Sequence, residues 1–363
     1  MTRTPSLFDP VEIGALKLSN RIVMAPLTRN RAGPGDVPSA LAVEYYRQRA
    51  TAGLIVSEGS QISQQGQGYE STPGIYTAAQ VEGWKPITRA VHDAGGRIVI
   101  QLWHVGRVSH VSLQPGGAAP VAPSAIRAET KTYLKGGFAD VSEPRALETG
   151  EIAGIVADYA AAAKNAIEAG FDGVEIHGAN GYLIDQFLCD GTNRRTDAYG
   201  GSPENRTRFL AEVLAAVTDT IGAGRTGLRL SPASPANGIS DSNRQVTFNA
   251  AADVVGRFGL AFVHVVEGAT GGARDFIPDF DFAEIRRRAK APYIANNGYD
   301  KALAEAAIAG GRADLVAFGR PFISNPDLVE RLRRGAPLAP LNRDTLYGGG
   351  AHGYTDYPPL ENA

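Results

Sequence analysis

Short β-rich runs alternate with alanine-rich helical patterns along the whole chain, and this alternation limits the possible folds more than any other feature. The candidate strands are 21–26, 53–59, 97–103, 173–178, 226–232, 262–268, 291–297 and 315–320. Helical patterns follow them near 39–51, 77–94, 150–169, 203–221, 245–258, 281–289, 300–310 and 325–334. Strands that are each followed by a helix form parallel α/β sheets, and eight such units suit a closed (β/α)8 TIM barrel. An open doubly wound sheet is the structural alternative.

The length of 363 residues suits one large barrel with insertions or two ordinary domains. No internal repeat or low-complexity linker divides the sequence, so we expect a single barrel domain over residues 1–363. The interval 104–149 is irregular and rich in proline, glycine and serine, and it predicts a hairpin around Gly136–Gly137. We expect this interval to be an insertion after the third strand that caps the barrel mouth.

Charge and cysteine content exclude several classes of protein. There are 36 basic and 38 acidic residues without a long run of one sign, so nothing favours nucleic acid or a membrane surface as partner. The single cysteine, Cys189, excludes an intrachain disulfide, fits a reducing compartment and reads as a buried structural thiol. The N-terminus lacks the apolar core of a secretory signal, and no apolar stretch approaches the roughly 20 residues that span a bilayer. We therefore expect a cytoplasmic protein.

Polar residues at the strand ends are the first candidates for a site, because active sites of such barrels lie at the C-terminal ends of the strands. These residues are Thr28, Gly59, Gln101, His177, Arg229, Asn297, Gly298, Gly319 and Arg320. Lysine is absent from all eight strand ends, which argues against a Schiff-base aldolase. The carboxylates Glu58 and Glu267 lack histidines at ligand spacing, so we expect no metal site.

The ends of the last two strands predict a phosphate site. "ANNG" at 295–298 and "AFGR" at 317–320 place Gly298 and Gly319 where backbone N–H groups can approach an anion closely. Arg320 could add a two-pronged contact. The alternative is that the glycines only turn the chain and that Arg320 pairs with a surface carboxylate.

Two polar residues inside the strands need partners. Arg229 lies between Leu228 and Leu230, so it points into the barrel if both leucines face the helices. A guanidinium there needs an anionic or strongly accepting partner, which is either a cofactor or Glu175 in an internal ion pair. Gln101 could bind a heterocycle, or it could be a satisfied core amide.

The segment "VEIHGANGYLIDQF" at 174–187 concentrates hydrogen-bonding groups where a strand ends. His177 and Asn180 are three residues apart, so we expect them to share a face of a first helical turn. As two neutral donors they could converge on one carbonyl oxygen and stabilise negative charge that forms on it. Tyr182 could supply a proton nearby. The alternatives are a hydrogen-bonded core histidine, a helix-capping asparagine and a core tyrosine.

Several long motifs in the same order resemble the old yellow enzymes, a family of flavin-dependent ene-reductases. They begin with "LFDPVEIGALKLSNRIVMAPLTRNRA" at 7–32 and "QLWHVGR" at 101–107. The most distinctive is "HGANGYLIDQFLCDGTNRRTDAYGGSPENRTRFLAEV" at 177–213, and "AFGRPFISNPDLVERL" and "YGGGAHGYTDYPPL" complete the match. The tail resembles that of bacterial members such as pentaerythritol tetranitrate reductase and N-ethylmaleimide reductase.

The resemblance implies a barrel that holds FMN without a covalent bond and takes electrons from NADPH or NADH. The implied FMN-binding residues are Pro26, Leu27, Thr28, Gly59, Gln101, Arg229, Asn297, Gly298, Gly319 and Arg320. His177 and Asn180 would clamp the activating oxygen of the substrate, and Tyr182 would be the proton donor. Trp103 and Tyr347 would shape the substrate pocket.

The implied reaction is reduction of electron-poor alkenes, namely unsaturated carbonyl compounds, imides or nitroalkenes, by a monomer or homodimer. Many bacterial relatives carry a second histidine at the position of Asn180, and alanine is frequent at that of Gly59, so substrate preference does not carry over. A phosphate-dependent barrel lyase without flavin and a non-catalytic flavin protein are the rival functions.

Overall fold

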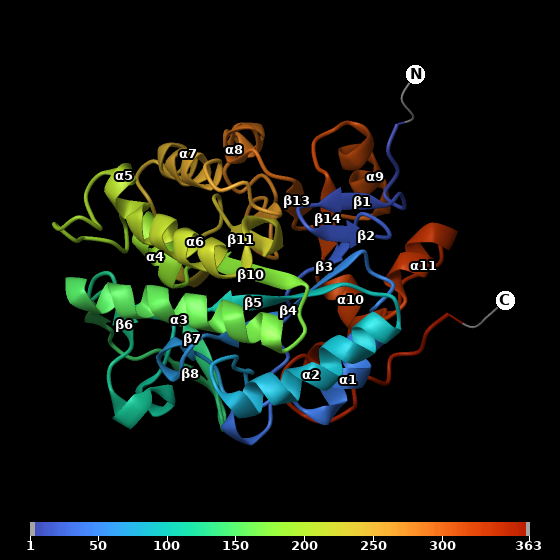
Figure 1. The fold of residues 1–363 in the computed structure, drawn as a ribbon, viewed down its shortest axis with the longest axis horizontal. Coiled ribbons are helices and arrows are strands. Elements are labelled where there is room, and N and C mark those ends of the chain that lie inside the picture. The colour runs from blue at the N-terminus through green and yellow to red at the C-terminus, as the bar shows by residue number, and fades with distance from the viewer. Residues whose placement is uncertain (1–3, 361–363) are drawn as a thin grey trace.

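The computed structural model describes residues 4–360, and its centre is a closed barrel of eight parallel strands (Figure 1). In spatial order these are β3 (Ile22–Met24), β4 (Leu54–Gln61), β5 (Ile98–Trp103), β10 (Gly173–Gly178), β11 (Thr226–Leu230), β12 (Phe262–Val266), β13 (Tyr293–Asn296) and β14 (Leu315–Phe318). Strand β14 pairs again with β3, which closes the barrel. The predicted barrel is confirmed, and the open sheet is excluded.

A helix follows each barrel strand, and the helices surround the strands in Figure 1. They are α1 (Ala40–Arg47), α2 (Ala78–Asp93), α3 (Thr149–Glu168), α6 (Arg208–Ile221), α7 (Arg244–Val255), α8 (Phe282–Ala289), α9 (Lys301–Ala309) and α11 (Leu328–Arg334). Three shorter helices are α4 (Leu183–Leu188), α5 (Pro203–Arg206) and α10 (Arg320–Ser324). Within residues 4–360, no helix is both long and apolar enough to cross a bilayer.

Strand side chains alternate between the outside and the inside of the barrel. In β11, Leu228 and Leu230 belong to the large apolar cluster that also contains the helix residues Phe209 and Leu214. Arg229, between the two leucines, therefore faces the barrel interior, as the sequence predicts. The same alternation directs Glu175 and His177 of β10 inward, because their neighbours Val174 and Ile176 join the outer cluster.

An N-terminal hairpin packs against the barrel end where the strands begin. Its strands β1 (Val11–Ile13) and β2 (Leu16–Leu18) pair antiparallel, and Ala15 donates to the carbonyl of Gly224 just before β11. The buried hairpin residues share an apolar cluster with inward-facing barrel residues, namely Val23, Ala25, Leu54, Val56, Val99, Phe262, Ile294, Leu315 and Ala317. The hairpin thus supplies an apolar floor and leaves the opposite end of the barrel for the polar residues.

The segment between β5 and α3 lies over the mouth of the barrel. Its strands β7 (Lys131–Leu134) and β8 (Gly137–Asp140) form the predicted hairpin, and β6 (Val121–Ala122) pairs with β9 (Arg145–Ala146). Val105, Val108, Ala128 and Val141 form an apolar cluster with Trp103 at the end of β5, against which the mouth residues Tyr69 and Tyr182 pack. The capping insertion after the third barrel strand is confirmed.

The hairpin floor yields a test of stability. Leu16 is 4% exposed, and Leu16→Ala should lower the free energy of unfolding by about 2–5 kcal/mol, because it leaves a cavity in the barrel floor. The neighbouring Lys17 has a side chain that is 79% exposed, so Lys17→Ala should change that energy by less than about 0.5 kcal/mol. Urea unfolding followed by circular dichroism measures both, and equal stability of the two variants would refute a floor that supports the barrel.

Candidate active site

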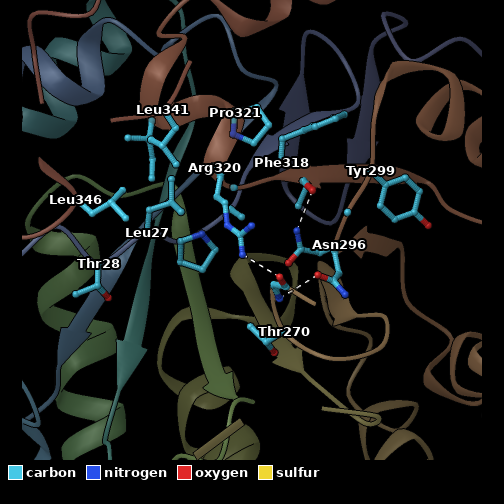
Figure 2. Close-up of a pocket in the computed structure, with 18 of the residues that line it drawn as sticks. Leu27, Thr28, Thr270, Asn296, Tyr299, Phe318, Arg320, Pro321, Leu341 and Leu346 are labelled. Atoms are coloured by element: carbon cyan, nitrogen blue, oxygen red, sulfur yellow. Dashed lines mark hydrogen bonds between the residues drawn. The ribbon is translucent and has the colours of Figure 1, made fainter. Parts of the chain in front are cut away.

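The C-terminal ends of the strands open into a cavity of about 730 Å³, part of which Figure 2 shows. The predicted site residues in its lining are Pro26, Leu27, Thr28, Asn180, Arg229, Asn297, Gly298, Gly319, Arg320 and Tyr347. The other predicted residues, Gly59, Gln101, Trp103, His177 and Tyr182, do not belong to this lining. Most of the predicted cofactor residues are thus brought together around one cavity, and Trp103, His177 and Tyr182 form a separate group.

One end of the cavity is rich in glycine and carries a cation. Gly298 has a φ of 66°, a conformation that glycine adopts without strain, and Gly319 precedes the short helix α10. Arg320 donates from Nη2 to the carbonyl of Gly271 at 2.9 Å, an interaction that Figure 2 shows as a dashed line. Within residues 4–360 it forms no ion pair, so the alternative in which Arg320 pairs with a surface carboxylate does not hold.

The side chain of Asn297 braces the neighbouring loop. Its Nδ2 donates to the carbonyls of Glu267 and Ala269 at 2.8 and 2.9 Å, and its Oδ1 accepts from the N–H of Gly271 at 3.1 Å. The amide is therefore committed to the protein. Any contact of Asn297 with a ligand in the cavity must come from its backbone.

Arg229 lines the cavity, and only part of its guanidinium is hydrogen-bonded to the protein. Its Nη2 donates to Oδ1 of Asn296 at 2.8 Å, and Asn296 in turn donates to the carbonyl of Ala317. Buried Nε of Arg229 has no partner in the part of the chain that the structure describes. The internal ion pair with Glu175 does not form. Glu175 instead accepts from Nε2 of Gln101 at 2.8 Å.

The turn after β10 differs from the prediction in its backbone. Asn180 and Gly181 have φ of 58° and 75°, both left-handed, and α4 begins only at Leu183. The prediction that His177 and Asn180 share a helical turn is wrong, because two consecutive left-handed residues cannot belong to a right-handed helix. The backbone N–H of Asn180 donates to the hydroxyl of Ser231, and its carbonyl accepts from the side chain of Asn237. The N–H of Gly181 donates to Asp185, and its carbonyl accepts from the side chain of Gln186.

His177 and Asn180 are each held by a bond that leaves a donor unused. Nδ1 of His177 accepts from the backbone N–H of Ala179 at 3.3 Å, so the ring proton lies on Nε2. Burial holds the pKa of His177 well below its ordinary value, which keeps the imidazole neutral. Oδ1 of Asn180 accepts from the hydroxyl of Thr270 at 2.7 Å, so Nδ2 is the group that remains for a ligand.

Aromatic rings gather beside the cavity. The ring centroid of Trp103 lies 4.9 Å from that of Tyr182, 5.4 Å from that of Tyr69 and 6.1 Å from that of His177. The hydroxyls of Tyr69 and Tyr182 are 3.0 Å apart. Burial raises the pKa of Tyr182, so it stays protonated at neutral pH. A side chain at Gly59 would strike the ring of Trp103 at 2.5 Å, which explains the glycine.

Comparison with known proteins identifies the family. Residues 6–339 match the model of the NADH:flavin oxidoreductase / NADH oxidase family. The chain belongs to this family, that of the old yellow enzymes. It is 48% identical to putative 12-oxophytodienoate reductase 11 of Oryza sativa subsp. japonica, over 99% of both chains. A structure of morphinone reductase with tetrahydroNAD superposes with a TM-score of 0.93 at 50% identity, covering 99% of this chain and 98% of the other. The old yellow enzyme homologue of Zymomonas mobilis gives 0.94 at 47% identity, covering 98% and 100%.

The cavity fits the FMN that this flavin oxidoreductase family uses. Its volume of about 730 Å³ lies in the range of ordinary cofactor sites. Arg229 lines the cavity with only its Nη2 bonded to the protein and offers donors to a heterocycle, and Gly298, Gly319 and Arg320 offer an anion site at another part of the lining. The enzyme is an NAD(P)H-dependent oxidoreductase, as expected from the sequence.

Several residues that shape this site were missed by the sequence analysis. Asn296 and His264 face the barrel interior, and strict alternation along their strands would have identified both. Tyr69 and Thr270 come from irregular loops, and Asn237 comes from a single 3-10 turn within a loop. Loop residues carry no periodic signal, so only the folded chain brings them to the site.

Asp185 anchors the turn from inside the protein. It is completely buried, and its Oδ2 accepts from the N–H of Gly181 at 2.8 Å. Sγ of buried Cys189 lies 3.6 Å from its Oδ1. Burial raises the pKa of Asp185 to about 6, and the bond from Gly181 only partly opposes this shift. The folded protein therefore binds a proton here more tightly than the unfolded chain does.

This anchor predicts a pH dependence of stability. Between about pH 4 and pH 6 the carboxyl of Asp185 is ionised in the unfolded chain but still protonated in the folded protein. The folded state therefore binds more protons, and the contribution of Asp185 makes the free energy of unfolding fall as pH rises. Asp185→Asn removes this effect. Relative to wild type, the variant should gain up to about 3 kcal/mol in free energy of unfolding between pH 4 and pH 7. Urea titrations across this range measure the difference, and a pH-independent difference would contradict the raised pKa.

Proposed function

We propose that this enzyme is an ene-reductase that reduces alkenes activated by a carbonyl, imide or nitro group. Family membership, the unused donors of His177 and Asn180, and the ring of Tyr182 at 5.0 Å from that of His177 support this reaction class. When bound, FMN would supply the hydride chemistry, accepting a hydride from NADPH or NADH and delivering it to the β-carbon of the alkene. The side chains of the protein would then bind and orient the alkene, polarise its activating group and protonate its α-carbon.

The proposed FMN contacts fall into two groups, one for the flavin ring and one for the phosphate. Pro26, Leu27, Thr28 and Arg229 of the lining, together with Gly59 of β4 and Gln101 of β5 outside it, would hold the ring. Asn297, Gly298, Gly319 and Arg320 would hold the phosphate end. Arg229 supports this arrangement most directly, because its buried Nε lacks a partner and a buried donor without one is costly. Asn297 would contribute its backbone, since its amide braces the loop.

His177 and Asn180 would bind the activating oxygen of the substrate. A neutral imidazole N–H and an amide N–H stabilise an oxygen more strongly as it gains negative charge in the transition state. Because both donors are neutral, they form no ion pair with the bound substrate beforehand. The bonds from Ala179 to His177 and from Thr270 to Asn180 fix which atoms face the ligand. Loss of one well-placed donor of this kind costs about 2.7–4 kcal/mol in the reaction barrier.

Tyr182 would deliver a proton to the α-carbon of the substrate. Its raised pKa keeps the hydroxyl protonated at neutral pH, and Tyr69 at 3.0 Å orients it. Trp103 packs edge-on against Tyr182, and Tyr347 lines the cavity, so both would shape the substrate pocket. The rival lyase without flavin is disfavoured by the family match, and a non-catalytic flavin protein is disfavoured by the set His177, Asn180 and Tyr182.

The proton donor gives a test of this mechanism. Tyr182→Phe removes one hydroxyl and keeps the ring that packs on Trp103. Reduction of the bound flavin by NADPH or NADH protonates no alkene carbon, so its rate should change little. Reoxidation by cyclohexenone needs the proton and should slow by roughly 10²–10⁴-fold if Tyr182 is the sole acid. Stopped-flow absorbance measures the two half-reactions separately.

Tyr159→Phe serves as the matched control, because the hydroxyl of Tyr159 is buried in α3 and has no partner in the described chain. It should leave both rates unchanged. Equal slowing of both half-reactions in Tyr182→Phe would mean that the variant disturbs the flavin site as a whole. An unchanged enone step would remove Tyr182 from the mechanism.

A further inference from the structure

Two ionisable side chains inside the barrel take no part in the proposed reaction. Nδ1 of His264 on β12 lies 2.7 Å from Oε2 of Glu175 on β10, and both side chains are completely buried. Strand β11, which carries Arg229, runs between β10 and β12. Its residue in register with Glu175 is Gly227, so no side chain at that position obstructs the bond. The pair therefore bridges the strand that holds Arg229.

The second oxygen of Glu175 fixes an amide of the proposed cofactor site. Nε2 of Gln101 donates to Oε1 of Glu175 at 2.8 Å. A carboxylate oxygen only accepts, so this bond sets the amino group of Gln101 toward Glu175. The carbonyl oxygen of Gln101 and its second amide proton are left for another partner. The orientation of Gln101 is thus determined by Glu175.

The charges of this group balance. Burial lowers the pKa of His264, which keeps the ring neutral with its Nδ1 proton donated to Glu175, so the pair carries one negative charge. Burial also lowers the pKa of Arg229, while the charge of Glu175 opposes that shift. No carboxylate in residues 4–360 forms a direct ion pair with Arg229. Glu175 is therefore the inner countercharge of Arg229, acting without contact.

We propose that Glu175 and His264 form a positioning unit in the barrel interior that orients Gln101, offsets the charge of Arg229 and thereby lowers the reduction potential of bound FMN. This inference rests on the proposed function, because it needs FMN to bind at Gln101 and Arg229. Reduction adds negative charge to a flavin, so a nearby cation raises its potential and a nearby anion lowers it. A lower potential favours hydride delivery to weakly activated alkenes.

The first experiment removes the charge and keeps the shape. Glu175→Gln retains an oxygen that can accept from Gln101, so oxidised FMN should still bind with nearly unchanged affinity. The reduction potential, measured by anaerobic equilibration with a reference dye, should shift to a more positive value. Glu44→Gln removes the same charge from the surface of α1, where the side chain is 42% exposed, and should leave the potential unchanged.

A second pair of variants separates charge from simple packing. His264→Asn keeps a donor near the position of Nδ1, so the bond to Glu175 is retained and the potential should remain close to that of wild type. His264→Leu removes the donor to Oε2 of Glu175 and leaves only the bond from Gln101 to Oε1, and loss of a hydrogen bond to a buried carboxylate disfavours its charged form. The potential of His264→Leu should therefore shift in the same positive direction as that of Glu175→Gln. This pair decides the question if Glu175→Gln does not fold.

Each outcome has one meaning. An unchanged or more negative potential in Glu175→Gln overturns the positioning unit, as do equal shifts in the two His264 variants. Wild-type protein that retains FMN and reduces enones in those experiments leaves the proposed function intact. Wild-type protein that binds no FMN overturns the proposed function itself.

Discussion

The closed barrel forces every second strand side chain into one narrow interior that water hardly enters, and the other features of the structure depend on this constraint. Apolar residues and the N-terminal hairpin fill the end where the strands begin. The polar inward residues Gln101, Glu175, His177, Arg229 and His264 are left to satisfy one another or a ligand. Nε of Arg229 and Nε2 of His264 are buried and have no partner in the described chain. Because burial makes an unpaired polar group costly, the one of the two residues that lines the cavity, Arg229, is informative about function.

The site combines this rigid interior with loops that are held by side chains from many elements. The turn of Asn180 and Gly181 has all four of its backbone polar groups bonded to side chains of the protein. Thr270 and Ala179 then determine which atoms of Asn180 and His177 remain free. In the proposed reaction, such fixed donors would lose little freedom when a substrate oxygen arrives, which is the advantage of a preorganised site.

The sequence predicted what depends on strand alternation and long motifs. The eight strands, the capping hairpin and the inward direction of Arg229 are confirmed, since each follows from local periodicity or turn residues. The helical turn at His177 was wrong because the left-handed backbone of Asn180 cannot be read from residue spacing. The N-terminal hairpin was missed because strands of three residues are too short to show a clear alternation of apolar and polar residues. The partners of Glu175 could not be known before strands distant in sequence met.

The central claim is that the barrel carries electrons from a nicotinamide to an activated alkene through one bound FMN. An anaerobic titration of the purified protein, followed by its visible absorption spectrum, tests this claim most directly. The account predicts a yellow protein whose flavin is bleached by NADPH or NADH and fully reoxidised by an added enone in the absence of oxygen. A colourless protein that FMN does not reconstitute, or a bleached flavin that enones leave unchanged, would contradict it.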